Sequence, residues 1–282
     1  MNIKKIVVVG AGTMGSGIAQ TAAASGCDVA LMDVDQQRAA AAVGLIRNRL
    51  ENRVTTGRIS AKGKELVLSR ITTIPGLEGC GDADLVIEAA SEKDSVKQAI
   101  FRQLDAIAPS SAIFASNTSA ISITRLAAAT TRPERFIGLH FMNPAHVMKL
   151  VEIIPGLGTG PEIVTSVFAL CEKMGKQPVV VADAPGFVAN RLLMPAVNEA
   201  IQALQEGIAS REDIDLVMKL GAGHPMGPLE LADFIGLDVC LQILETLHRE
   251  LGEKFRPCPL LRTMVDGGKL GRKNGEGFYD YR

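Results

Sequence analysis

The stretch Ile3-Lys-Lys-Ile-Val-Val-Val-Gly-Ala-Gly-Thr-Met-Gly15 decides the fold. Its first part, to Val9, is short and rich in β-branched residues, as in a buried parallel strand, and an alanine-rich run typical of a helix follows Gly15. In a strand–turn–helix, the first glycine permits a tight turn, the second lets backbone N–H groups reach a pyrophosphate, and the third lets helix and strand pack closely. The pattern predicts a dinucleotide-binding turn with these contact residues: Gly10, Gly12, Thr13, Met14 and Gly15.

The second predicted strand, Val29–Asp33, ends in a carboxylate at the distance from the glycines that suits a contact with the adenosine ribose hydroxyls. Asp35 is a rival acid, but Asp33 lies nearer the strand end. A carboxylate here repels a ribose 2′-phosphate, and no arginine follows Asp33 before Arg38. The sequence therefore predicts NAD as the cofactor in preference to NADP. A tight turn without any ligand is the alternative.

Strand-like and helix-like stretches alternate through the first 180 or so residues. Further apolar, strand-like runs begin at Leu85, Ala112, Phe136, Leu150 and Val179, and helical stretches separate most of them. Such alternation is typical of a mostly parallel sheet covered by helices on both faces. We therefore expect an α/β fold of the Rossmann type.

The pattern changes at Ala184-Pro-Gly-Phe187, beyond which no convincing strand follows. Helical periodicities instead cover residues 192–206, 213–220 and 229–251. The sequence predicts two domains: a Rossmann-type NAD-binding domain over residues 1–185 and an all-helical C-terminal domain over residues 186–282.

Composition narrows the class of protein. The chain has 282 residues, 47% of them hydrophobic, and a net charge of -1, which allows a sizeable core and argues against a general nucleic-acid binder. No apolar run approaches the roughly 18 residues needed to cross a bilayer, and the N-terminal sequence has no signal-peptide features. Its five cysteines are scattered, without Cys-x-x-Cys, and its histidines lack metal-ligand spacing. We expect a soluble, metal-free cytoplasmic protein without a nucleic-acid or membrane partner.

A histidine and a glutamate occur in two successive apolar strands. His140 lies in Phe136-Ile-Gly-Leu-His-Phe-Met142, and Glu152 is enclosed by Leu-Val and Ile-Ile. A carboxylate in such a run is expensive to bury without a partner, and the preceding histidine can provide one. An imidazole can accept a hydroxyl proton near neutral pH, while a carboxylate orients the ring and stabilises its charged form. The pair indicates acid–base catalysis, although a lone strand histidine is more often a core residue.

Segments along the whole chain resemble the 3-hydroxyacyl-CoA dehydrogenases. They are residues 10–20, Ser116-Asn-Thr-Ser119, Gly138-Leu-His-Phe-Met-Asn-Pro144, Lys149-Leu-Val-Glu-Ile-Ile154, Pro185-Gly-Phe-Val-Ala-Asn-Arg191, residues 224–231 and residues 271–279. The length is similar to that of the short bacterial members that act on 3-hydroxybutyryl-CoA. The resemblance implies NAD-dependent, reversible oxidation of an (S)-3-hydroxyacyl-CoA to the 3-ketoacyl-CoA.

The resemblance also assigns roles to individual residues. His140 is implied as the general base and acid, with Glu152 as its orienting partner. Ser119 and Asn190 are implied to hydrogen-bond the C3 oxygen and thioester region of the substrate; without the resemblance they would be an ordinary loop hydroxyl and a polar residue at a helix start. The implied cofactor contacts, besides the glycine turn and Asp33, are Glu92, Lys97, Asn117, Ser119, Asn143 and Lys273.

The segment from Arg38 to Lys64 forms a basic stripe, because it contains seven cations and only one acid, Glu51. On a nearly neutral protein such a stripe suits the phosphates of an acyl-CoA, and we take Arg49 and Arg53 as candidate contacts. A solvated helix face is the alternative. The family usually places lysines in this region, so the assignment of individual CoA contacts differs here.

Two other functions compete with this hypothesis. A β-hydroxyacid-type dehydrogenase also has a Rossmann domain followed by helices, but it uses a catalytic lysine motif that we do not find. An NAD-binding protein without activity is the second, and the presence of both His140 and Glu152 argues against it. The resemblance implies that the helical domain completes the substrate site and forms a homodimer, for which the apolar segment Leu229–Leu247 could supply the interface.

Overall fold

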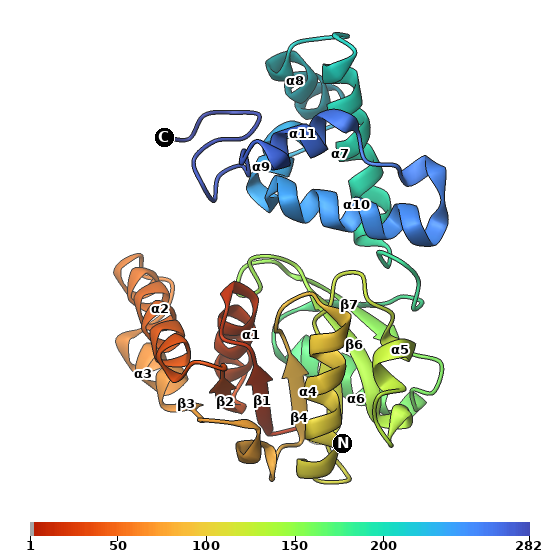
Figure 1. Cartoon of the computed structure of the whole chain (residues 1–282). Helices are drawn as coiled ribbons and strands as arrows, with labels where there is room; N and C mark the ends of the chain where they lie inside the picture. Colours follow the sequence, from red (N-terminus) through yellow and green to blue (C-terminus); the bar gives the residue numbers. More distant parts are fainter. Residues whose placement is uncertain (1–2) are drawn as a thin grey trace. The chain divides into compact units, whose positions relative to one another are not determined.

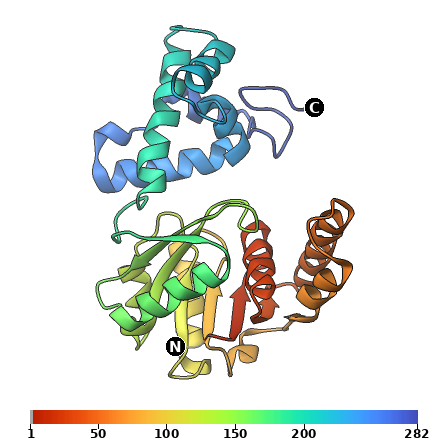
Figure 2. The same cartoon turned by 180° about the vertical axis from the view of Figure 1, so that it is seen from behind.

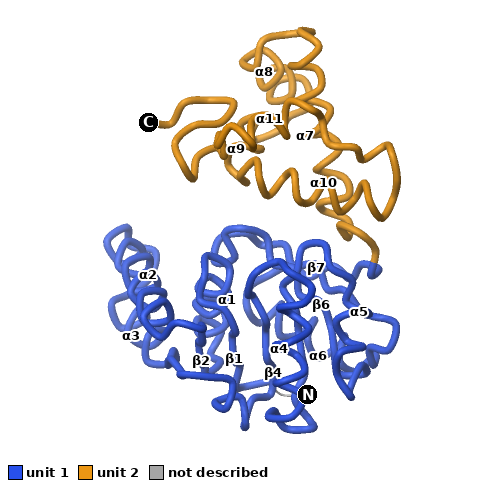
Figure 3. The backbone as a smooth tube through the Cα atoms, in the orientation of Figure 1, with its two compact units in different colours: residues 1–183 blue, residues 184–282 orange. Residues whose placement is uncertain are grey.

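The computed structural model describes residues 3–282, which fall into two compact units. Unit 1 ends at Asp183 and unit 2 spans Ala184–Arg282 (Figure 3). The boundary predicted from the sequence, between residues 185 and 186, lies two residues further along the chain. None of the helices among the described residues is both long enough and apolar enough to span a membrane.

Unit 1 is built on a sheet of eight strands in the order β3-β2-β1-β4-β5-β6-β7-β8 (Figure 1). Among the described residues, neighbouring strands are parallel except β6 and β7, which are antiparallel. The mostly parallel sheet predicted from the sequence is therefore confirmed. The strands are Lys5–Val9 (β1), Asp28–Met32 (β2), Ile71–Thr73 (β3), Leu85–Glu88 (β4), Ile113–Ser116 (β5), Phe136–Phe141 (β6), Leu150–Pro155 (β7) and Gln177–Val180 (β8).

Helices cover both faces of this sheet (Figures 1 and 2). On one face, Val8, Ile87 and Leu139 belong to a core cluster that also contains Ile18 of α1 and Val167 of α6. On the other, Phe101 of α4 packs on Phe114 and Phe136, with ring centroids 5.9 and 4.5 Å apart. The helices of unit 1 are Thr13–Ala24 (α1), Gln36–Thr55 (α2), Ala61–Ser69 (α3), Asp94–Ile107 (α4), Ile123–Ala127 (α5) and Pro161–Lys173 (α6), with short 3-10 turns at Leu77–Cys80 (η1) and Pro133–Arg135 (η2).

Unit 2 is helical, as the sequence predicts. Its helices are Ala189–Gln205 (α7), Arg211–Gly221 (α8), Pro228–Ile235 (α9), Leu237–Leu251 (α10) and Pro259–Asp266 (α11), with a 3-10 turn at Glu253–Phe255 (η3). The prediction of one continuous helical stretch over 229–251 is wrong, because Gly236 has a φ of 105° and separates α9 from α10. A helix cannot continue through that backbone conformation, and glycine adopts it without a Cβ clash.

Most apolar side chains of the segment Leu229–Leu247 are buried inside unit 2. Leu237, Leu244 and Leu247 are fully buried in its core cluster. Phe234 and Val239 remain 39% and 38% exposed, and a role of this segment in a dimer interface stays a prediction. Exposed apolar side chains also lie on α8, where Leu216, Val217 and Leu220 are 50%, 64% and 78% exposed.

The C-terminal turn of unit 2 is anchored on one buried carboxylate. Asp233 on α9 accepts hydrogen bonds from the backbone N–H of Phe278 and Tyr279, both at 2.9 Å, and from the hydroxyl of Tyr281 at 3.1 Å. A Cβ at Gly277 would lie 1.9 Å from Asp233 Oδ1, so the turn approaches α9 as closely as a glycine allows. Burial raises the pKa of Asp233 above its ordinary value, although these hydrogen bonds oppose the shift.

Candidate active site

The glycine turn after β1 is shaped by close contacts within unit 1. Gly10 has a φ of 106°, and a Cβ there would lie 2.5 Å from the carbonyl oxygen of Ala89. A Cβ at Gly15 would lie 1.7 Å from the carbonyl oxygen of Gly10, so helix and strand pack as closely as the sequence predicts. Gly12 differs, since a Cβ there would meet no described atom within 4 Å.

The fold therefore needs glycine at positions 10 and 15, whereas position 12 points into open space at the start of α1. No side chain caps that helix and no acidic residue lies in its first turn. Its positive N-terminal end suits an anionic group, and a side chain at position 12 would fill the space that a pyrophosphate needs. The geometry fits a dinucleotide cofactor.

Asp33 lies directly after β2, next to this turn. Its Oδ2 accepts a hydrogen bond from the backbone N–H of Ala11 at 2.8 Å, and its side chain is half-buried. The rival acid, Asp35, caps α2 by accepting from Gln37 N at 2.8 Å. Asp35 thus has a structural role, which favours Asp33 as the acid beside the glycine turn.

His140 and Glu152 face each other across β6 and β7. The two residues are direct partners in the antiparallel register, so their side chains project from the same face of the sheet. His140 Nδ1 lies 2.7 Å from Glu152 Oε2, and the residues are 6% and 2% exposed. Because Glu152 occupies Nδ1, an exchange of a proton between His140 and a substrate must use Nε2.

The loop after β5 is held beside this pair. Ser116 at the end of β5 is in register with Gly138 on β6, and Asn117 Oδ1 accepts from Phe141 N at 3.0 Å. Ser119 lies two residues further on, and its N–H donates to Glu92 Oε1 at 2.8 Å. The parallel strands β1, β4, β5 and β6 share one carboxyl edge, where ligands bind in folds of this class.

A buried carboxylate near this edge is missing from the residues predicted from the sequence. Glu88, at the end of β4, is fully buried, and the Lys97 ammonium lies 2.7 and 2.9 Å from its two oxygens. Ser116 Oγ donates to Glu88 at 2.6 Å. The signal that identified Glu152, an acid in an apolar strand, is also present in Leu85-Val-Ile-Glu88.

Lys97 is 1% exposed, and its ammonium also lies 3.2 Å from Glu92 Oε2. Glu92 in turn accepts from Thr118 and Ser119. Lys97 is therefore connected to the Ser119 loop through Glu92, and a direct contact of Lys97 with a cofactor stays a prediction.

The remaining predicted residues lie in three places. Asn143 is in the loop after β6, in unit 1. Asn190, which is 9% exposed, is in the first turn of α7. Lys273 is in the C-terminal turn and forms an ion pair with Asp238 of α10. Asn190 and Lys273 thus belong to unit 2, and their roles toward ligands in unit 1 stay predictions.

The basic stripe lies on two helices: Arg49 and Arg53 are on α2, and Lys64 is on α3. Lys64 binds Glu51 at 2.7 Å and Glu65 at 3.1 Å, so the acid of the stripe is already paired. Arg49 turns toward α1, where its Nη1 donates to Ser16 Oγ at 3.2 Å, and burial lowers its pKa. Arg53, four residues later, is exposed.

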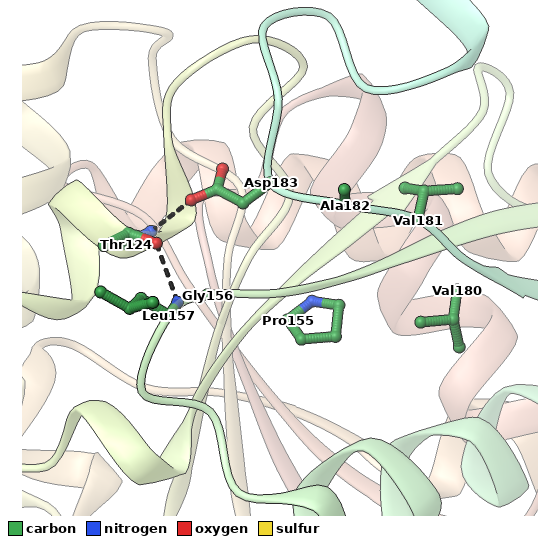
Figure 4. Close-up of a pocket in the computed structure, with 8 residues that line it drawn as sticks. All are labelled: Thr124, Pro155, Gly156, Leu157, Val180, Val181, Ala182 and Asp183. Carbon is green, nitrogen blue, oxygen red and sulfur yellow. Dashed lines mark hydrogen bonds between the residues drawn. The ribbon is translucent and has the colours of Figure 1, made fainter.

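A separate open pocket lies where β7 and β8 end (Figure 4). Its lining consists of Thr124, Pro155, Gly156, Leu157 and Val180–Asp183. None of the predicted catalytic or cofactor residues is among these residues. Asp183 points to Thr124 and accepts its N–H at 2.8 Å (Figure 4), so this carboxylate serves the start of α5.

Comparison with known proteins covers the whole chain. The family model for the NAD-binding domain of 3-hydroxyacyl-CoA dehydrogenase matches residues 5–184, and the model for its C-terminal domain matches residues 186–281. A 3-hydroxybutyryl-CoA dehydrogenase of Bradyrhizobium diazoefficiens is 52% identical, with 99% of this chain and 96% of the relative aligned. The crystal structure of (S)-3-hydroxybutyryl-CoA dehydrogenase from Ralstonia eutropha is 45% identical and covers both chains completely, with a TM-score of 0.96.

Proposed function

This chain belongs to the 3-hydroxyacyl-CoA dehydrogenase family and is an NAD-dependent oxidoreductase, and from that premise we propose that it interconverts (S)-3-hydroxybutyryl-CoA and acetoacetyl-CoA. The short acyl group is suggested by the names of the relatives that match over full length. The observation that carries the chemistry is the buried His140–Glu152 pair at the carboxyl edge of a sheet that also carries the glycine turn.

His140 is the proposed general base of the oxidation. Its Nε2 takes the proton of the C3 hydroxyl, and in the reverse direction it returns that proton to the oxygen. Glu152 holds Nδ1 at 2.7 Å, which orients the ring and stabilises the imidazolium that forms. Proton transfer of this kind contributes roughly 10²–10⁴-fold to the rate.

The other residues bind and orient. Gly10–Gly15 would hold the pyrophosphate of NAD and Asp33 its ribose, and the bound cofactor would supply the acceptor for the C3 hydride. Ser119, on the loop that Glu92 supports, is proposed to hydrogen-bond the C3 oxygen, and Asn190 the thioester region. Arg49 and Arg53 are proposed to meet the phosphates of CoA, since no acid of the stripe remains to neutralise them after Lys64 binds Glu51.

A turnover assay tests this function. Acetoacetyl-CoA is added to the enzyme and NADH, and the loss of NADH is followed with identification of the product. We expect one (S)-3-hydroxybutyryl-CoA per NADH oxidised, and little turnover with acetoacetate, which lacks the CoA part. Binding of NADH without turnover of acetoacetyl-CoA would contradict the proposal, and preference for the free acid would favour a β-hydroxyacid dehydrogenase.

We also propose that the enzyme is a homodimer. The support is the row of exposed apolar side chains on α8, Leu216, Val217 and Leu220, which a second copy could bury. Sedimentation equilibrium at micromolar concentration should give twice the chain mass, and the double variant Leu216→Glu/Leu220→Glu should give the monomer. A monomeric wild-type protein would contradict this part of the proposal.

A further inference from the structure

The loop after β6 is clamped between two elements of unit 1 near the start of α1. A Cβ at Gly17 would lie 3.0 Å from Ala145 Cβ and 3.4 Å from His146 N, so helix and loop are in direct contact. The buried ammonium of Lys176 binds the carbonyl oxygens of Ala145 and Met148. The loop that carries His146 is therefore held by its contact with α1 and by the hydrogen bonds from Lys176.

One arginine of α2, Arg49, contacts the same part of α1, and a second, Arg53, lies one turn further along α2. Arg49 donates to Ser16 Oγ, and Ser16 is the neighbour of Gly17, the residue that touches the loop. Arg53 follows Arg49 by four residues and so lies on the same side of α2. His146 of the loop and Arg49 of α2 thus both lie beside the first turns of α1, and Arg53 of α2 is close enough for its charge to act on His146.

This group of residues has an excess of positive charge. Burial and then the charges of Arg49, Lys176 and Arg53 lower the pKa of His146, and no carboxylate of the described residues acts in the opposite direction. Glu51, which lies between Arg49 and Arg53 in the sequence, is bound by Lys64 at 2.7 Å. A cluster of cations without an acid is the arrangement expected for an anionic ligand.

The buried nitrogen of His146 determines which form of the ring is stable. His146 Nδ1 is buried and has no hydrogen-bond partner among the described residues. A proton on Nδ1 would bury an unsatisfied N–H, and on a charged ring it would also be repelled by the charges of Arg49 and Arg53, which is unfavourable. The stable form is a neutral ring with its proton on Nε2, and this N–H can donate to a ligand without adding a third charge.

We propose that His146, as a neutral Nε2–H donor, completes with Arg49 and Arg53 a binding site for a phosphate group of the acyl-CoA substrate. The two arginines supply the attraction and the imidazole supplies a directed hydrogen bond. This inference rests on the proposed function, because that function provides the phosphate-bearing ligand.

Calorimetric binding of adenosine 3′,5′-bisphosphate tests the site without a reaction. His146→Leu should weaken binding about tenfold, because one hydrogen bond to a charged group is lost. His146→Gln, whose amide N–H can replace Nε2–H, should recover most of that loss. Arg47→Gln removes a cation from the same helix but outside the cluster, and it should weaken binding less than His146→Leu does. Thermal unfolding and NADH binding of each variant check that the fold is retained.

Two results would overturn the inference. Equal affinity of wild type and His146→Leu would remove His146 from the site. An affinity ratio of the two proteins that rises steeply from pH 8.5 to pH 6.5 would show a charged imidazole in place of a neutral donor; we expect a constant ratio. Failure of the proposed function is read separately: absent turnover of acetoacetyl-CoA with His146-dependent bisphosphate binding would reject that function and retain the phosphate site.

Discussion

Glu152 and Glu88 are two buried glutamates on the same face of the sheet in unit 1, yet they have different partners. Glu152 on β7 meets the imidazole of His140, and Glu88 on β4 meets the ammonium of Lys97, each at 2.7 Å. Both carboxylates lie in apolar strands and are almost fully shielded from water. The register of β4, β5, β6 and β7 connects the two pairs through Ser116 and Gly138.

The two pairs differ in whether the partner of the glutamate can gain and lose a proton near neutral pH. An imidazole can gain or lose its proton near neutral pH, whereas the ordinary pKa of an ammonium is about 10.4. The first pair can therefore exchange a proton with a ligand near neutral pH, whereas the second presents a fixed positive charge to Glu88 and Glu92. Under the proposed function, a buried carboxylate supports catalysis beside an imidazole on β6 and holds its neighbours beside an ammonium on α4.

The largest expected effect is the loss of activity in His140→Gln, which removes the imidazole of the first pair. We expect kcat to fall about 10³-fold, or about 4 kcal/mol, because the proton acceptor is lost in the transition state. NADH affinity should change little. Steady-state kinetics and NADH titration measure both quantities, and a kcat close to that of the wild type would exclude His140 as the base.

The second prediction concerns Lys97→Met, which leaves Glu88 buried without its partner. The free energy of unfolding should fall by about 3 kcal/mol, since removing one member of a buried pair leaves an uncompensated charge. Urea titration measures the loss. The double variant Lys97→Met/Glu88→Gln serves as the control and should recover part of the stability. A stability loss in His140→Gln as large as that in Lys97→Met would abolish the distinction between the two pairs.

A third variant, Glu152→Gln, tests whether the carboxylate acts only through the ring. It should lower kcat about 30-fold, or about 2 kcal/mol, less than His140→Gln, because the ring remains but its charged form is less stabilised. The pH dependence of kcat should change as well. An effect on kcat as large as that of His140→Gln, without a change in the pH profile, would indicate that Glu152 only maintains the structure.

Asp33 is a third carboxylate, and it extends the comparison because its side chain meets only backbone N–H groups of the described residues. The carboxylate oxygens of Asp33 can accept further hydrogen bonds, and the hydroxyls of a ribose can donate them. We expect kcat/KM for NADH to exceed that for NADPH by at least about tenfold, or about 1.4 kcal/mol, and Asp33→Ser to reduce this preference. Equal use of the two cofactors by the wild type would show that Asp33 does not meet the ribose.

Much of unit 1 can be predicted from the sequence because short, strongly apolar strands alternate with helices. β3 cannot, since it has three residues and two of them are exposed. The break at Gly236 is also hidden, because α9 and α10 both bury apolar residues and their periodicities run together. His140 and Glu152 are predicted as partners because each lies in an apolar strand.

Contacts between distant residues are harder to predict. Glu88 has the same sequence signal as Glu152, but its partner is a lysine nine residues away on a helix, and nothing in the local pattern distinguishes Lys97 from a solvated one. The position of His146 beside Arg49 likewise depends on how a loop lies against α1, which no spacing in the sequence reveals.

The anchor of the C-terminal turn on Asp233 has a consequence for protein synthesis. Phe278 is 4% exposed in the core of unit 2, and Asp233 receives its hydrogen bonds from residues 278, 279 and 281. The sheet of unit 1 is complete once β8 has been made at Val180. Translation proceeds at about 5–20 residues per second, so unit 1 has roughly 5–20 s to fold before the partners of Asp233 exist. Asp233 itself precedes Phe278 by 45 residues, so α9 and α10 wait roughly 2–9 s for the segment that completes their core. Docking of the C-terminal turn is therefore the last step in forming unit 2.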